Sequence, residues 1–163
     1  MTTHLPDTNI LIDALNGKRG HKELLGSLLV QGNRLASCAI TLAELFSGIR
    51  PGDLSKVEEF VSVFRWQQMT PAIALKAGRW RHDYARQGVT LALADALIAA
   101  TAAEHGLTLI TENRKHFPMP ELHFYPLPGA TILIERPALG TAGHPNFWAL
   151  QIRWLGSRTL LVL

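Results

Sequence analysis

The sequence has little of what stabilises secreted or membrane proteins. Its 163 residues include a single cysteine, so no disulfide can form within one copy of the chain. No apolar run approaches the roughly 20 residues that a membrane-crossing helix needs. The first residues have neither the basic region nor the apolar region of a signal peptide. We therefore expect a protein without membrane-spanning segments that works in the reducing environment of the cytoplasm.

Two common kinds of functional motif are also missing. No glycine-rich phosphate-binding loop occurs, which argues against nucleotide hydrolysis of the P-loop kind. The seven histidines are scattered without paired metal-ligand spacing, which argues against a zinc site. Cys38 has no evident histidine partner in the sequence, and we interpret it as a small core residue rather than a nucleophile.

The composition is that of a folded domain with a mildly basic surface. Apolar residues make up 47% of the chain and charged residues only 18%, which is sufficient for one domain with a sizeable core. Lysine and arginine exceed aspartate and glutamate by 16 to 13. This surplus is compatible with binding to a polyanion but does not by itself indicate one, because many soluble proteins are equally basic.

Strand-like and helix-like segments alternate along most of the chain. Short apolar runs predict strands at residues 3–6, 34–37, 66–69, 107–110 and 123–125. Helical periodicity and capping signals predict helices at residues 8–15, 22–30, 41–49, 54–64, 71–86 and 92–105. Because such alternation favours parallel strands with helices on both faces, we expect an α/β fold with a mostly parallel central sheet flanked by helices.

Acidic and polar side chains occur at the ends of these expected elements. Asp7 follows the first strand directly, and Asn113 follows the fourth. Glu44 lies at the start of the helix after the second strand, and Asp95 lies in the early turns of an otherwise apolar helix. Ligands of parallel sheets collect at the carboxyl ends of the strands. Three carboxylates meeting there would repel one another unless a cation such as Mg²⁺ or Mn²⁺ lay between them.

Each acid also has an ordinary structural explanation when it is taken alone. Asp7 occupies the position of a helix N-cap. Glu44 completes a predicted capping box that begins at Thr41. Asp95 is placed where a negative charge interacts favourably with a helix dipole. From the residues alone, both the structural and the metal-binding interpretations stay open.

Four short segments occur in a fixed order along the chain. They are Asp-Thr-Asn-Ile-Leu-Ile-Asp at 7–13, Thr-Leu-Ala-Glu-Leu at 41–45 with Gly48, Asp-Ala-Leu-Ile-Ala-Ala at 95–100, and Leu-Ile-Thr-Glu-Asn-Arg-Lys-His-Phe at 109–117. Together these segments resemble the motifs of the PIN-domain family, and within it the VapC-type toxins of bacterial toxin–antitoxin pairs. The resemblance covers roughly residues 1–128, which we expect to form a PIN-like nuclease domain with a three-layer fold.

The resemblance implies a metal-dependent ribonuclease that hydrolyses RNA phosphodiester bonds with Mg²⁺, or alternatively Mn²⁺. Asp7, Glu44 and Asp95 match the three acids of the family and would be the metal ligands and catalytic residues. Around the last motif many relatives have an aspartate, whereas this chain has Asn113 and His116. Asn113 is retained as a catalytic candidate because its amide oxygen can orient water, although it brings no charge.

The resemblance also implies protein partners. We expect a cognate antitoxin that holds the chain inactive, and a homodimer to which the apolar stripe at 54–64 contributes unless it faces the core. Two other functions stay open. The chain could be a catalytically weak module that serves as the antitoxin-binding partner in a DNA-binding autorepressor complex, or it could be a DNA-directed nuclease.

Two further regions give less specific signals. The basic candidates for contact with phosphates are Arg50, Arg79, Arg81, Arg114 and Lys115. The segment 79–86 mixes basic and aromatic residues, which either grip RNA or simply pack the aromatic rings. Residues 129–163 match no motif, and their glycine and proline content predicts an extended or loosely structured tail whose role the sequence does not define.

Overall fold

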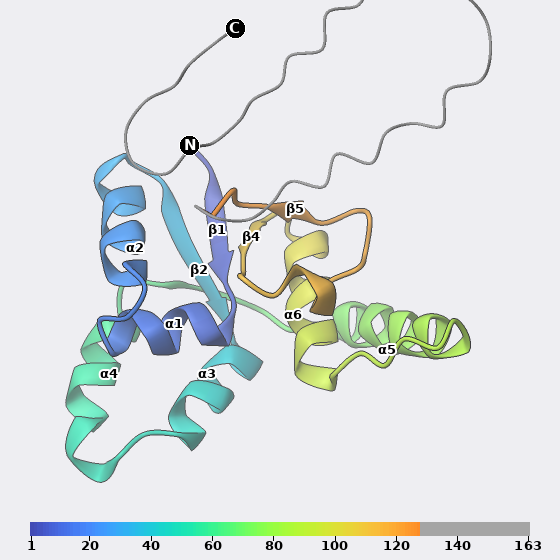
Figure 1. Cartoon of the computed structure of the whole chain (residues 1–163), viewed down its shortest axis with the longest axis horizontal. Helices are drawn as coiled ribbons and strands as arrows, with labels where there is room; N and C mark the ends of the chain where they lie inside the picture. Colours follow the sequence, from blue (N-terminus) through green and yellow to red (C-terminus); the bar gives the residue numbers. More distant parts are fainter. Residues whose placement is uncertain (128–163) are drawn as a thin grey trace, which may run out of the picture. The chain divides into compact units, whose positions relative to one another are not determined.

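The computed structural model describes residues 1–127, in which a central sheet is flanked by helices (Figure 1). The strands are β1 (Thr3–Pro6), β2 (Arg34–Cys38), β3 (Arg65–Gln67), β4 (Thr108–Ile110) and β5 (His123–Phe124). The α-helices are α1 (Thr8–Leu15), α2 (His21–Val30), α3 (Ala39–Ser47), α4 (Leu54–Val61), α5 (Pro71–Arg86) and α6 (Leu93–Glu104). Short 3₁₀-helices cover Pro51–Asp53 and Arg114–His116. The predicted tail at 129–163 lies outside the described residues.

The sheet has five strands in the order β3-β2-β1-β4-β5, and every neighbouring pair is parallel. The predicted α/β class with a parallel sheet is therefore confirmed. Strands β2 and β3 lie on one side of β1. Strands β4 and β5, which come later in the chain, lie on its other side. The strand order thus reverses between β1 and β4, which is where ligands of open parallel sheets collect.

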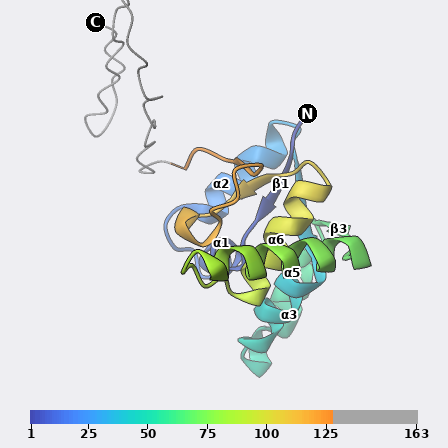
Figure 2. The same ribbon diagram turned by 90° about the vertical axis from the view of Figure 1, so that its right-hand side faces the viewer.

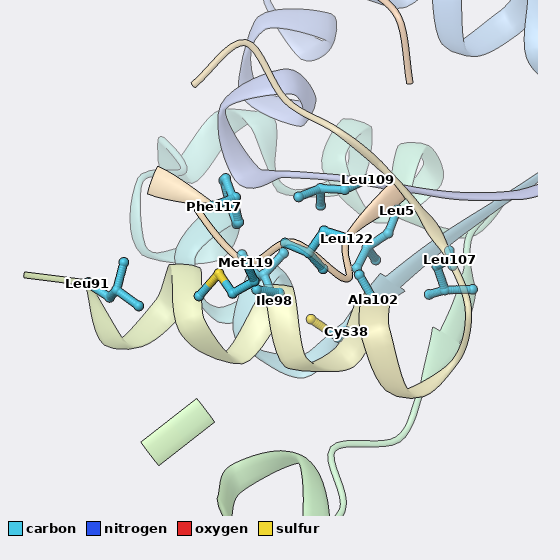
Figure 3. Close-up of a cluster of buried hydrophobic side chains, with 12 residues drawn as sticks. Leu5, Cys38, Leu91, Ile98, Ala102, Leu107, Leu109, Phe117, Met119 and Leu122 are labelled. Atoms are coloured by element: carbon cyan, nitrogen blue, oxygen red, sulfur yellow. The ribbon is translucent and has the colours of Figure 1, made fainter. Parts of the chain in front are cut away.

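Two hydrophobic clusters lie on opposite faces of the sheet. Leu5 of β1 and Leu109 of β4 are buried in one cluster together with residues of α6 such as Ile98, as Figure 3 shows. Leu35 of β2 and Ile110 of β4 are buried in the other cluster, which includes residues of α1, α2, α3 and α4. Neighbouring residues of one strand enter different clusters because side chains alternate across a sheet. The result is a three-layer arrangement of helices, sheet and helices.

Helix α5 packs on the outer side of α6 rather than on the sheet. Its Ile73 and Ala77 are buried against Ala96 and Ala100 of α6. Figure 2 shows α5 running across α6 in this outer position. The small alanine side chains allow the two helices to approach closely, so this pair extends the helical layer on one face.

Helix α3 begins earlier than the sequence predicts. Strand β2 continues to Cys38, which is the N-cap of α3, so the helix starts at Ala39 without an intervening loop. Thr41 is therefore inside the first turn and completely buried, and its hydroxyl lies 3.4 Å from the Cys38 thiol. The expected capping box from Thr41 to Glu44 is wrong, because Thr41 is not at the end of the helix.

The apolar stripe at 54–64, of which α4 covers Leu54–Val61, mostly faces the core. Val57 and Phe64 are buried in the cluster with α1 and α2, and Phe60 and Val61 pack against the same cluster. Leu54, at the start of the stripe, is exposed. Of the two alternatives for residues 54–64, core packing accounts for most of the stripe.

The aromatic residues of α5 also serve packing. Trp80 and Tyr84 pack against the buried cluster around α6, and Arg81 donates a hydrogen bond from Nε to the carbonyl of Leu91 at 3.0 Å. The structural interpretation of the segment 79–86 therefore accounts for its two aromatic rings.

Within residues 1–127, no helix has both the length and the apolar character needed to span a bilayer.

Candidate functional site

The carboxyl ends of β1 and β4 meet at Asp7. The Asp7 amide donates to the carbonyl of Ile110 at 2.9 Å, which continues the parallel pairing one residue beyond the strands. The side chain is almost fully buried and is held from two directions. Its Oδ1 accepts from the Ile10 amide at 2.9 Å, and its Oδ2 accepts from the Thr111 hydroxyl. Asp7 is thus the N-cap of α1, as expected, and also faces the end of β4.

The surroundings of Asp7 disfavour its negative charge overall. Burial raises the pKa of the Asp7 carboxyl, the hydrogen bonds from Thr111 and Ile10 lower it, and the nearby Asp95 carboxylate raises it further. Within residues 1–127 no salt bridge to Asp7 is found. A helix cap alone does not require this burial next to a second acid, so the position is better explained if a cation is part of the site.

Glu44 of α3 is linked to the same region through α1. The hydroxyl of Thr8, the first residue of α1, donates to Glu44 Oε2 at 2.5 Å. Because Thr8 follows Asp7 directly, this bond fixes Glu44 relative to the end of β1. The carboxylate of Glu44 is partly exposed, so it has access to solvent.

Asp95 lies in the first turn of α6 and is affected by the other acids. Burial raises the pKa of the Asp95 carboxyl, the neighbouring His116 lowers it, and the charge of Glu44 raises it. His116 Nδ1 lies 3.2 Å from Asp95 Oδ2. The charge of Asp95 raises the pKa of Asp7 and that of Glu44 raises the pKa of Asp95, so each predicted acid lies within electrostatic range of at least one other.

Asn113 and Asp7 line a hollow of 440 Å³ at the strand ends. The Asn113 amide donates to the Thr111 hydroxyl at 3.0 Å, and its side-chain amide lies 3.0 Å from the His116 ring. The other residues that line the hollow are Asn9, Ile12, Asp13, Arg19 and Glu112. Glu44 and Asp95 do not line it, so Asp7 is the one predicted acid that faces this hollow.

The donor set of the site suits a hard divalent cation. Asp7, Glu44 and Asp95 offer carboxylate oxygens, and Asn113 offers an amide oxygen; such ligands are preferred by Mg²⁺ and Mn²⁺. Among residues 1–127, no three acids, histidines or cysteines lie close enough together to enclose an ion. This does not conflict with Mg²⁺, which is commonly held by only one or two carboxylates and completes its octahedral shell with water and substrate phosphates.

Two arginines of this region differ from what the sequence predicts, Arg114 in its contacts and Arg19 in its position beside the hollow. The guanidinium carbon of Arg114 lies 4.9 Å from the centre of the Phe124 ring, and its Nη2 donates to the Tyr125 carbonyl at 3.4 Å. Arg114 therefore contacts β5 and the residue that follows it. Arg19, which motif reasoning missed, lines the hollow beside Asp7. The one signal for it was its position in a turn between Gly17 and Gly20, directly after the first motif.

Comparison with known proteins agrees with this geometry. The family model described as the PIN domain matches residues 5–120. The chain is 36% identical over 115 residues to "Ribonuclease VapC19" of Mycobacterium tuberculosis, which covers 71% of this chain and 92% of that protein. It is 38% identical over 115 residues to "Ribonuclease VapC10" of the same organism, which covers 71% of this chain and 86% of that protein.

Among solved structures, the chain is similar to one in VapBC2 from Rickettsia felis bound to a DNA fragment from their promoter. The TM-score is 0.67 and the identity 27%, and the match covers 76% of this chain and 98% of that chain.

Proposed function

The chain belongs to the PIN-domain family, and from this premise we propose that it is a metal-dependent endoribonuclease that acts as the toxin of a toxin–antitoxin pair. The observation that supports this proposal most strongly is the placement of Asp7. Its carboxylate is buried at the point where strand order reverses, close to a second acid and without a basic partner among residues 1–127. A carboxylate placed in this way is suited to bind a divalent ion.

In this proposal Asp7 and Asp95 hold the ion, and Glu44 lies nearby as the third acid of the site. When bound, Mg²⁺ supplies activation of water and neutralisation of the charge that develops on the phosphate oxygens. The hydrogen bonds from Ile10 and Thr111 orient Asp7 but use only part of the acceptor capacity of its two oxygens. The carboxylate can therefore keep its position and still serve as a ligand.

The other polar groups of the site position the acids. Thr8 orients Glu44 through its hydroxyl, and His116 orients Asp95 through its ring nitrogen. Asn113 faces the hollow next to Asp7, where its amide can position a water molecule or a phosphate oxygen. Water adds to phosphorus as the bond to one ribose oxygen breaks, so no covalent enzyme intermediate is required.

The proposal includes a protein partner. The similar structure from Rickettsia felis is described as a VapBC2 assembly on DNA, which supports the expectation that this chain binds a cognate antitoxin. We propose that the antitoxin covers the acidic site and that one of its basic side chains pairs with the carboxylates. The homodimer expected from the family belongs to the same proposal.

The experiment that tests the catalytic proposal compares nucleic acids and variants side by side. The purified chain, Asp7→Asn and Asp53→Asn are each incubated with total RNA and with DNA in Mg²⁺. We expect the parent and Asp53→Asn, whose substituted residue is exposed and lies outside the four motifs, to cut RNA, and Asp7→Asn to be inactive.

Two results would overturn the proposal in different ways. Cleavage of DNA but not RNA would make the chain a DNA-directed nuclease. Cleavage of neither polymer by the folded parent would overturn the nuclease proposal and favour the binding module of an autorepressor complex.

A further inference from the structure

We propose that Arg19 contacts a backbone phosphate of the RNA and positions the strand over the acidic site. This inference rests on the proposed ribonuclease function and adds a substrate-binding residue to it. Arg19 lines the same hollow as Asp7 and Asn113, and it is the only lysine or arginine in that lining within the part of the chain that is described. The hollow otherwise presents the carboxylates of Asp7, Asp13 and Glu112.

Electrostatics require a cation at this place. RNA carries one negative charge on each phosphate, and it must approach a surface where three carboxylates are gathered. A divalent ion at the acids would neutralise charge on the reacting phosphate, but a neighbouring phosphate of the same strand would still meet Asp13 and Glu112. A guanidinium group between these acids and the strand reduces this repulsion, and it can donate charge-assisted hydrogen bonds to phosphate oxygens.

The side chain of Arg19 is held in place by two acids from different segments. Its Nη1 lies 3.4 Å from Asp13 Oδ2 of α1 and also contacts Glu112 Oε2 after β4. His21 of α2 supports the same acids, with Nε2 at 3.2 Å from Glu112 and Nδ1 at 3.7 Å from Asp13. Asp13, which is close to Arg19 in sequence, and Glu112, which is far from it, thus fix the guanidinium at the hollow that Asp7 also lines.

The free part of the guanidinium faces solvent. Both contacts with the acids use Nη1, and within residues 1–127 no hydrogen bond donated by Nε or Nη2 is found. The side chain is 62% exposed. Because guanidinium has five N–H donors in a planar fork, Arg19 can keep its contacts with both acids and still donate to a phosphate.

The backbone at Arg19 has an unusual conformation. Its φ angle is +54°, and it is the only residue other than glycine with a positive φ within residues 1–127. The turn that contains it is bounded by Gly17 at φ +63° and Gly20 at φ +69°. A side chain that carries a Cβ is disfavoured in this conformation, and such residues concentrate at functional sites. Glycine would be favoured here if the turn alone mattered.

The test measures RNA affinity and its salt dependence in full-length protein. Binding of a fluorescently labelled, mixed-sequence, single-stranded RNA is measured in Mg²⁺ by anisotropy, with Asp7→Asn as the background to prevent cleavage. Arg19→Gln is compared with Lys22→Gln, which removes the same charge from an exposed position of α2 outside the hollow. The melting temperature of each variant is measured in parallel.

We expect Arg19→Gln to weaken binding about tenfold, as for the loss of one charge-assisted hydrogen bond. The slope of log Kd against log salt concentration should fall by about 0.7, the value for one phosphate contact on a single strand. Arg19→Lys should restore most of this slope because it keeps the charge. Lys22→Gln should bind as the background does.

Two outcomes would overturn the inference and are distinguishable from each other. If the parent chain cleaves RNA but Arg19→Gln binds RNA with the affinity and salt slope of Lys22→Gln, Arg19 has only a structural role, and a lowered melting temperature would accompany it. If the parent neither cleaves nor binds RNA, the proposed function itself fails and this inference fails with it.

Discussion

Each acid of the candidate site is held by a neutral or basic side chain from another segment. Thr111 holds Asp7, Thr8 holds Glu44, and His116 contacts Asp95. These contacts fix the direction of the carboxylates without cancelling their charge completely. At the scale of single residues, we therefore make separate predictions for the acids and for the groups that orient them.

Asp95→Asn separates a metal ligand from a structural acid. Cleavage of RNA should fall at least about a hundredfold, which corresponds to ~2.7 kcal/mol of transition-state stabilisation. The pKa of Asp95 is raised above its usual value by burial, so at neutral pH its charge opposes folding, and removing that charge should raise the melting temperature slightly in EDTA. Activity on total RNA and thermal unfolding in EDTA are the two measurements.

The opposite pair of results would show that Asp95 is structural. A helix-dipole or ion-pair role predicts that Asp95→Asn melts earlier in EDTA and still cuts RNA at close to the parent rate. Asp83→Asn is a matched control, because Asp83 is an exposed acid of α5 and should change neither quantity appreciably.

Thr8→Val tests the orientation of Glu44. The substitution removes the hydroxyl that donates to Glu44 Oε2 but keeps the size of the side chain. Loss of a group that orients a metal ligand commonly costs about 10- to 100-fold in activity or metal affinity, and we expect a decrease in cleavage rate of that order. Thr8→Ser, which keeps a hydroxyl, should retain most of the activity, and equal loss in both variants would point to damaged packing of α1 instead.

Part of the site could be predicted from the sequence for a simple physical reason. Asp7 follows β1 directly and Asn113 lies three residues after β4, and the carboxyl ends of parallel strands meet at one edge of a sheet. The contacts of Arg19 with Asp13 and Glu112 could not be predicted in this way. They depend on how the turn after α1 approaches the end of β4, which local patterns do not specify.

At the scale of elements, periodicity predicted the strands and helices well, but their ends less well. Helix α5 has the predicted bounds, Pro71–Arg86, because Thr70 caps it and Pro71 suits the first turn. The start of α3 was predicted wrongly because a capping box is a local pattern. The observed start depends on the continuation of β2 to Cys38, which is determined by its pairing with β3 up to Gln67.

Strand β1 carries a buried histidine that should make folding stability depend on pH. His4 packs edge-on against the Tyr125 ring at 5.4 Å, and within residues 1–127 its Nδ1 has no hydrogen-bond partner. Burial lowers the pKa of His4 below 6.5, so the unfolded chain binds the proton more tightly than the folded one. This contribution to stability is present above about pH 6.5 and is lost as the pH falls through the lowered pKa.

His4→Phe should remove this part of the pH dependence. The ring against Tyr125 is kept, so between about pH 7 and pH 5 the variant should lose less of its unfolding free energy than the parent does. Denaturant unfolding at each pH is the measurement. His123→Gln, at an exposed position of β5, should keep the parent's pH dependence; parallel curves for His4→Phe and the parent would show that protonation of His4 does not couple to folding.

At the scale of the whole molecule, the proposed function predicts toxicity that a partner relieves. Expression of the chain alone should arrest growth, and co-expression of the cognate antitoxin should restore it. Asp7→Asn should still bind the antitoxin, because it changes one atom of a buried side chain, yet should not arrest growth. Harmless expression of soluble, folded parent protein would contradict the assignment as a toxin.

The central claim is that the acids gathered at the strand ends use a divalent ion to cut RNA. Its most direct test is the rate at which the purified chain cleaves total RNA in Mg²⁺, after addition of excess EDTA, and after Mg²⁺ is restored. We expect cleavage that stops in EDTA and returns with Mg²⁺ or Mn²⁺. Cleavage at an unchanged rate in EDTA would contradict the claim, because Asp7, Glu44 and Asp95 would then act without the ion.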